Sequence, residues 1–400
     1  MKAVKNGLMT AVLCAALVPV LAAQKATLRD SAIRILRTVP LIDGHNDIPD
    51  AIRTDGGLDS VDFMAPKQKL MTDIPRLRSG HVGAQFWAAY VPVTTLHGGE
   101  HPAVYALEQI DLIDRLCRKS PQALALARTA ADVQRNFAAG RVSCLIGIEG
   151  GHAIENSLGA LRMFYDLGVR YMTLTHWETI DWADAATDTA KHGGLTPFGE
   201  DVVREMNRLG MLVDLSHVSD GTMSSALRVS KAPIIFSHSS ARALSNHVRN
   251  VPDSILKRVT TNGGIVMVNF NPAFVSEAVR QYGESTQARM RALKAAGVDS
   301  AAVADSSRRW SAATPHATLS QVADHIDYVR KVAGVDHVGI GSDFDGIESV
   351  PDGLEDVSKF PDLIAELLRR GWTATDVRKV AGLNLLQVLR EAEKVAAASK

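Results

Sequence analysis

The sequence predicts a parallel β-barrel of the (β/α)8 type, with a helical insertion before the last strand. Eight short runs of apolar and β-branched residues recur along the chain, and segments with helical periodicity separate most of them. These runs are apolar nearly throughout, as expected of parallel strands that are buried on both faces. Eight strands that alternate with helices over 400 residues favour a closed barrel, with a doubly wound open sheet as the main alternative.

The composition fits a large globular domain and disfavours nucleic acid as a partner. Hydrophobic residues make up 46% of the chain and charged residues 22%, so the chain can bury a large core. The 44 basic and 44 acidic residues cancel, and the pI is about 7.2. No basic stripe is therefore available to neutralise a phosphate backbone.

Residues 1–23 have the pattern of a secretory signal peptide. Two lysines precede an apolar run over residues 8–21, and two alanines then offer a cleavage site. The run is too short to favour a retained membrane anchor, and the leucine before Cys14 is a poor residue to precede a lipidated cysteine. We expect an exported, periplasmic protein without a transmembrane anchor, and one barrel domain over residues 24–400.

The elements follow one another in a regular order. A helix is predicted over residues 27–37, because apolar residues recur there at helical spacing and a proline follows. The predicted strands cover residues 41–43, 85–92, 142–148, 169–175, 211–216, 233–237, 264–270 and 337–342. Helical periodicity marks residues 157–167 and 200–209, and a glycine follows each of them. The Ala- and Arg-rich stretch over 276–310 is interpreted as the inserted helices, whose role as a lid, an interface or a decoration stays open.

Ionisable side chains stand at the C-terminal ends of six of the eight predicted strands. They are His45, Asp47, Glu149, His176, His217, His238 and Asp343. The active site of a (β/α)8 barrel lies at the C-terminal ends of its strands, so these side chains should converge although they are far apart in the sequence. A hydrophobic core whose few polar groups are hydrogen-bonded does not need seven ionisable side chains. The set therefore predicts a functional site.

The chemistry of this set suits a metal centre. Zinc and similar borderline cations take neutral imidazole nitrogen and carboxylate oxygen as ligands. His45 and Asp47 are one residue apart, so on a strand both side chains point to the same face and can bind one ion. Glu149 has two oxygens with which to bridge to a second ion, and His217 and His238 would complete that site. Each motif alone is weak, since Glu149 could equally cap a following helix, and the prediction depends on the whole set.

Several other motifs are interpreted as structural. Seven histidines lie in loops, in helical segments or at strand starts: His81, His97, His101, His192, His316, His325 and His337. The DFDG stretch at 343–346 lacks the later ligands of a calcium loop, and GIG at 339–341 lacks the third glycine of a dinucleotide fingerprint. Cys144 lies in an apolar strand and is expected to be a small core residue, because two cysteines do not make a disulfide framework.

Seven motifs, in this order, resemble the membrane dipeptidase (renal dipeptidase) family of the amidohydrolase superfamily. They are IDGHND at 42–47, GIEGGH at 147–152, RYMTLTH at 170–176, DLSHVS at 214–219, FSHSS at 236–240, RNVPD at 249–253 and GSDFDG at 341–346. The resemblance covers residues 30–392. It implies a (β/α)8 barrel with two Zn²⁺ ions, in which a metal-bridging hydroxide attacks the amide bond of dipeptides. L-L dipeptides are the expected substrates, and L-D dipeptides are candidate substrates.

The resemblance also implies a role for each site residue. One zinc ion would be bound by His45, Asp47 and Glu149, and the other by Glu149, His217 and His238. His176 would contact the substrate carbonyl, and Asp343 would bind the amino group or shuttle a proton as a general acid and base. Arg249 would bind the substrate carboxylate with its planar fork. A longer peptide presents an amide at that point, so selectivity for dipeptides is expected.

The chain departs from the family pattern at three places. Residues 180–184 read IDWAD where TPWAD is common, which changes the expected pocket shape, and Phe274 stands where a tyrosine is common. Mammalian relatives pair a cysteine that matches Cys117 with one in the strand 4 loop, and that position is Glu178 here, so we expect no such disulfide.

Two other functions stay open at this point. The same barrel could hydrolyse another amide, a lactam, a lactone or an N-acyl amino acid. A metal-binding or peptide-binding protein without catalysis is the third hypothesis, although a pure metal store has no need of His176 or Asp343. The resemblance favours a homodimer, but no stretch of the sequence identifies an interface.

Overall fold

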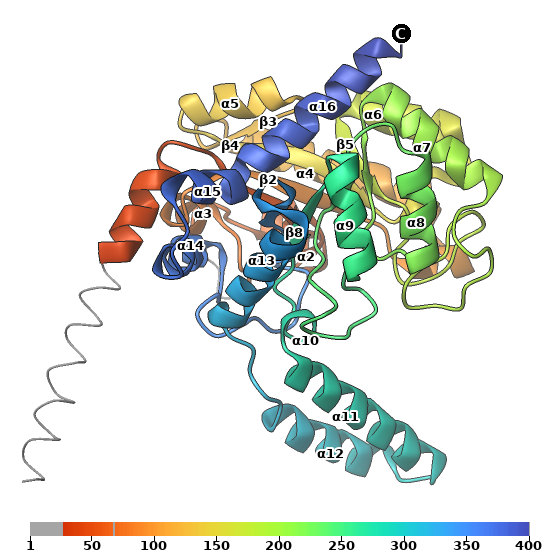
Figure 1. The fold of residues 1–400 in the computed structure, drawn as a ribbon. Coiled ribbons are helices and arrows are strands. Elements are labelled where there is room, and N and C mark those ends of the chain that lie inside the picture. The colour runs from red at the N-terminus through yellow and green to blue at the C-terminus, as the bar shows by residue number, and fades with distance from the viewer. Residues whose placement is uncertain (1–26, 67–68, 400) are drawn as a thin grey trace, which may run out of the picture.

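The computed structural model describes residues 27–66 and 69–399, and the predicted signal peptide at 1–23 lies outside them. Eight parallel strands form a closed barrel that helices surround (Figure 1). The strands are β1 (Leu41–Asn46), β2 (Val82–Tyr90), β4 (Val142–Glu149), β5 (Val169–Thr173), β6 (Leu212–Asp214), β7 (Ile235–Phe236), β8 (Ile265–Val268) and β9 (Val338–Ile340). Each strand pairs with the next in this order, and Asp43 opposite Ile340 joins β1 to β9. The predicted barrel is confirmed, and the open sheet is excluded.

One strand is absent from the prediction, and several strands are shorter than predicted, such as β6 and β9, which have three residues each where six were predicted. β3 (Leu124–Leu126) was missed because three residues are too few to show a period, and it pairs with Val142–Cys144 at the start of β4. β7 has only two residues where five were predicted. It ends early because the backbone N–H of Ser237 donates to the Asp214 carboxylate instead of joining the ladder.

The covering helices follow the alternation that the sequence predicts. They are α4 (Pro102–Lys119), α5 (Ala130–Ala138), α6 (Leu158–Leu167), α7 (Pro197–Leu209), α8 (Asp220–Val229), α9 (Asp253–Asn262), α13 (Leu319–Ala333), α14 (Phe360–Arg369) and α16 (Asn384–Ala398). Residues 27–36 are also helical, and shorter helices are α2 (Ile48–Thr54), α3 (Ile74–Ser79), α10 (Pro272–Val275) and α15 (Ala374–Arg378). Within the described part of the chain, no helix has the length and apolar character that a membrane span requires.

Local sequence sets the ends of these helices. The side chain of Thr196 accepts a hydrogen bond from the backbone N–H of Gly199 and Pro197 occupies the first turn, so α7 begins three residues before the predicted helix at 200–209. Gly210 ends it in the left-handed region, at φ 84°. Ser157 and Gly168 cap α6 in the same manner.

The barrel interior is filled by side chains that alternate with those facing the helices. Ile42 and Phe86 belong to the interior cluster, whereas their chain neighbours Leu41 and Trp87 belong to the layer between strands and helices. The interior cluster also contains Tyr171, whose ring occupies the space where a Cβ of residue 147 would lie, so only glycine fits there. Several α16 residues join the same cluster, so this helix covers the barrel end remote from the predicted site.

The predicted insertion forms two helices between β8 and β9. α11 (Glu277–Ala295) and α12 (Ser300–Ala312) project from the body of the molecule as a hairpin (Figure 1). Val279 in α11 and Val303 in α12 are their buried residues. Its position before the last strand is as predicted, and its role stays open.

The cysteines correct one prediction. Cys144 is fully buried, as expected, but it is not a free core residue, because it forms a disulfide with Cys117. Cys117 lies in the last turn of α4, which packs across β4 and brings the two Cα atoms to 6.9 Å. The expectation that Cys117 does not pair with a residue of the strand 4 loop is confirmed, since its sulfur is bonded to Cys144 in β4.

This disulfide should make a measurable contribution to stability. Its loop spans a sequence separation of 27 residues. Closing such a loop in the unfolded chain corresponds to about 2–4 kcal/mol of unfolding free energy. We expect the Cys117→Ala/Cys144→Ala variant to lose about that much in urea unfolding. Reducing agent should destabilise the parent protein and leave the variant unaffected, and equal stability of parent and variant would contradict this role.

Candidate metal centre and substrate cavity

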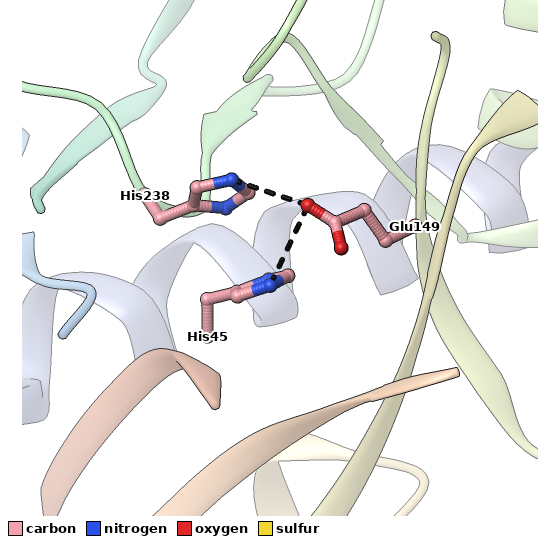
Figure 2. Close-up of side chains that lie close together, drawn as sticks. All are labelled: His45, Glu149 and His238. Atoms are coloured by element: carbon pink, nitrogen blue, oxygen red, sulfur yellow. Dashed lines mark ion pairs between the residues drawn. The ribbon is translucent and has the colours of Figure 1, made fainter. Parts of the chain in front are cut away.

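The strand ends bring the predicted ligands together around one carboxylate oxygen. Glu149 is the last residue of β4, and its Oε1 atom lies 3.6 Å from His45 Nε2, 3.3 Å from His238 Nε2 and 3.0 Å from His217 Nε2. Figure 2 shows His45 and His238 directed at Glu149 from two sides. Asp47 contacts His45 Nε2 at 3.1 Å. All five side chains are buried.

The ring nitrogen atoms at this centre converge on one another. His217 Nε2 and His238 Nε2 are 3.0 Å apart, and the buried His45 Nε2 lies 3.1 Å from Asp47 Oδ2 and 3.6 Å from Glu149 Oε1. Buried polar atoms are normally paired, so converging ring nitrogens require a proton or a cation between them. Three imidazoles with two carboxylates are a donor set for a divalent metal, and the residues therefore fit the predicted metal centre.

The charges of the centre agree with this fit. Burial lowers the pKa of His217 and His238 well below the usual value, so both rings are neutral as metal ligands must be. Burial alone would raise the pKa of Glu149, but its electrostatic interactions with His45 and His176 and its contacts with the His217 and His238 rings hold it well below its usual value. This carboxylate is therefore an anion that faces the neutral rings of His217 and His238. Burial alone would lower the pKa of His45, but Tyr171, Asp47 and this carboxylate hold it well above its usual value.

The candidate ligand atoms form more groups than the two predicted ligand sets, and the groups include two further residues, His176 and Asp343. Ligand atoms lie within 4.8 Å of one another in three overlapping groups. The groups are His45, Glu149 and His238; Glu149, His176 and His217; and His45, Asp47 and Asp343. All seven strand-end residues are thus brought together, and the division of five of them between two ions stays a prediction.

Backbone geometry holds two of these residues in place. His217 and Asp343 have φ angles of 69° and 65°, in the left-handed region that non-glycine residues rarely adopt. The Asp343 N–H donates to the His45 carbonyl at 3.0 Å, and its carboxylate accepts from Asn269 at 2.8 Å. A Cβ at Gly346 would overlap the carboxylate of Asp47, so position 346 admits only glycine without displacing that ligand.

A cavity of about 240 Å³ opens beside the centre. It is lined by Asp47, Asp50, Tyr90, Glu149, His176, Trp177, His217, Arg249, Asn271, Phe274, Asp343, Asp345, Gly346 and Ile347. The cavity holds both members of the predicted pair for proton transfer and oxyanion binding, Asp343 and His176. Burial raises the pKa of Asp343, and burial lowers that of His176 to about 4, so His176 is neutral near pH 7.

Arg249 is a buried cation in this cavity without an ion-pair partner in the described chain. Only 2% of it is exposed, and its Nε and Nη2 atoms have no hydrogen-bond partner. The guanidinium carbon lies 5.6 Å from the ring centre of Trp177 and 5.2 Å from that of Phe274. Burial lowers its pKa to about 10, so it stays charged at neutral pH. An unpaired guanidinium between two rings is suited to bind an anionic ligand.

Sequence reasoning missed part of this lining. Asp50, Tyr90 and Trp177 carry no motif of their own, and only the folded loops bring them to the cavity. Asp345 belongs to the DFDG stretch, which is interpreted above as lacking the ligands of a calcium loop. Its place two residues after the predicted site residue Asp343 is the sequence feature that could have indicated it as a lining residue. The histidines interpreted as ordinary lie elsewhere, for example His325, which is buried between the Ala241 N–H and the Val275 carbonyl.

Known proteins resemble this chain over nearly its whole length. A family model described as Membrane dipeptidase (Peptidase family M19) matches residues 29–400. Dipeptidase 3 of Mus musculus is 43% identical over 376 residues, which cover 92% of this chain and 67% of that protein. The crystal structure of the probable dipeptidase PvdM from Pseudomonas aeruginosa, at 24% identity, has the same fold with a TM-score of 0.81 over 93% of this chain and 100% of that one.

A second solved structure was determined with a ligand. It is a metallo peptidase from Rhodobacter sphaeroides liganded with a phosphinate mimic of the dipeptide L-Ala-D-Ala. It is 26% identical, with a TM-score of 0.70, and the match covers 88% of this chain and 99% of that one.

Proposed function

Because this chain belongs to the membrane dipeptidase family, peptidase family M19, we propose that it hydrolyses dipeptides with two zinc ions at the centre around Glu149. The single observation that supports this most is the convergence of three imidazole nitrogens on one Glu149 oxygen, at 3.0–3.6 Å, beside the cavity that holds Arg249. As a dipeptidase, the chain acts on a small substrate with a free carboxylate.

The ligands proposed for the first ion are His45, Asp47 and Glu149, and those for the second are Glu149, His217 and His238. When bound, such ions act as Lewis acids that lower the pKa of water and polarise the scissile carbonyl. The neutral state of His217 and His238 and the anionic state of Glu149 support these assignments.

Three residues of the cavity are proposed to act on the substrate. Arg249 binds the terminal carboxylate through its unpaired Nε and Nη2 atoms, which a dipeptide can reach and a longer chain cannot satisfy. His176, as a neutral imidazole, donates a hydrogen bond to the carbonyl oxygen when negative charge develops on it. Asp343 accepts the proton of the attacking water and returns it to the leaving amine, for which a carboxylate with a raised pKa is suited.

We further infer that the protein is exported. The disulfide between Cys117 and Cys144 supports this, because disulfides persist in oxidising compartments such as the bacterial periplasm. The homodimer and the cleavage after residue 23 stay predictions.

A substrate panel tests the proposed function. The zinc-loaded protein should release free amino acids from L-L dipeptides, and an L-D series shows whether the second subsite accepts a D-residue. Matched tripeptides should remain intact, and chelated protein should be inactive toward every member. If no dipeptide is cleaved while an N-acyl amino acid or a lactam is, the alternative amidohydrolase reaction is correct and the dipeptide proposal fails.

A further inference from the structure

Two buried aspartates near the proposed metal centre each accept two hydrogen bonds from a serine that follows a neighbouring strand. Asp214, at the end of β6, accepts the Ser237 backbone N–H at 2.9 Å and the Ser237 hydroxyl at 2.6 Å. Asp43, in β1, accepts the Ser342 backbone N–H at 2.7 Å and the Ser342 hydroxyl at 2.6 Å. All four residues are fully buried. In each pair, the residue after the serine is a site residue.

The two pairs differ in one contact. The Ser237 hydroxyl oxygen lies 2.8 Å from Nδ1 of His238, whereas the Ser342 hydroxyl has no contact with a histidine ring in the described structure. Instead, the Ser342 hydroxyl accepts a hydrogen bond from the Phe344 N–H at 3.2 Å. Only the pair of Asp214 and Ser237 is therefore connected to an imidazole.

The hydrogen bonds around Asp214 fix the direction of the protons. Its carboxylate also accepts from the Thr173 hydroxyl at 2.6 Å and the Ser216 N–H at 3.1 Å. A carboxylate only accepts, so the single proton of the Ser237 hydroxyl points to Asp214. The hydroxyl oxygen must then accept from His238, which places the proton of that ring on Nδ1. The lone pair of His238 is left on Nε2, which is directed at Glu149 (Figure 2).

We propose that Asp214 and Ser237 are positioning residues that fix the tautomer and ring orientation of His238, and thereby the affinity of the centre for its metal. This inference rests on the proposed function in so far as His238 is a metal ligand. Partners on the outer nitrogen of a ligating histidine orient it and raise its basicity, and their loss usually lowers metal affinity about 10–100-fold.

The equivalent pair provides matched controls. Ser237→Ala and Ser342→Ala each remove a buried hydroxyl with a 2.6 Å bond to a buried aspartate. Asp214→Asn places an amide N–H against the Ser237 hydroxyl, which then turns its own proton toward His238 Nδ1 and moves the ring proton to Nε2. Asp43→Asn likewise places an amide N–H against a serine hydroxyl, that of Ser342, but this hydroxyl has no hydrogen bond to a histidine ring in the described structure.

The experiment is a zinc competition titration of the metal-free protein against a chromophoric chelator, with thermal unfolding to show that each variant is folded. Ser237→Ala and Asp214→Asn should weaken zinc binding about 10–100-fold, and the two control variants should change it no more than a few-fold. The positioning role of Asp214 and Ser237 is refuted if the control variants weaken zinc binding as much as the test variants, or if no variant weakens it.

A second readout does not depend on zinc. The ring ¹⁵N resonances of His238 in the metal-free protein should show protonation at Nδ1, and at Nε2 in Asp214→Asn. Protonation of the His238 ring at Nε2 in the parent protein would overturn the proposed role of Asp214 and Ser237 even if the protein binds zinc. Failure of the parent protein to bind zinc, with His238 protonated at Nδ1, would refute the proposed function and leave the tautomer assignment intact.

Discussion

Replacing Asp343 by asparagine is expected to lower kcat about 10²–10⁴-fold while zinc content and folding are unchanged. The carboxylate is the one group in the cavity proposed to move the proton from water to the leaving amine. An amide of the same shape keeps the hydrogen bond from Asn269, which is 2.8 Å long in the parent, but cannot accept that proton. Turnover of a dipeptide at saturation and metal analysis of the same sample measure both quantities.

Asp345 offers a matched control for this substitution. It lies two residues further in the same loop, lines the same cavity, and burial raises its pKa to about 6. Its Oδ1 atom accepts the Met71 N–H at 2.7 Å, and it belongs to none of the candidate ligand groups of the described chain. Asp345→Asn should therefore reduce kcat far less. Equal losses in the two variants, or retained turnover in Asp343→Asn, would remove the proposed role of Asp343.

Replacing Arg249 by methionine is expected to lower kcat/KM for dipeptides at least about 30-fold, because truncating one partner of a buried charge pair removes about 2–5 kcal/mol of binding. The diagnostic quantity is the preference for a dipeptide over its C-terminal amide. The parent should strongly prefer the free carboxylate, and the variant should cleave both at similar rates. Side-by-side kinetics of the acid and the amide give this ratio directly.

The stability of the same variant separates this role from misfolding. In the free protein Arg249 is a buried cation without an ion-pair partner in the described chain, so its removal should maintain or raise the melting temperature. Arg228→Met is the control, since Arg228 forms a surface ion pair with Glu200 at 2.6 Å and lies outside the cavity lining. An acid-to-amide preference that is unchanged in Arg249→Met would show that another group binds the carboxylate.

The parts of the fold that local patterns determine were predictable. Continuous apolar runs identified the eight barrel strands, and the polar residues at their ends identified the seven residues that converge. This worked because parallel strands in a barrel all end on one face, so position within each strand is enough to predict convergence. The helical insertion was visible from its composition and its place between two strands.

Features that depend on contacts between distant segments were not predictable. The disulfide depends on how α4 crosses β4, and neither cysteine indicates its partner. The short β7 depends on Asp214, which takes the N–H that the ladder would have used. The Ser237–His238 dipeptide is plain in the sequence, but its connection to Asp214 appears only when β6 and β7 lie side by side.

The most direct test of the proposed metal centre is a titration of the metal-free protein with zinc, with dipeptide hydrolysis measured after each addition. We expect no turnover without metal and a rise to a plateau at two equivalents of zinc per chain, with a matched tripeptide uncleaved throughout. Full activity of the metal-free protein, or a plateau at one equivalent, would contradict a centre in which Glu149 bridges two ions.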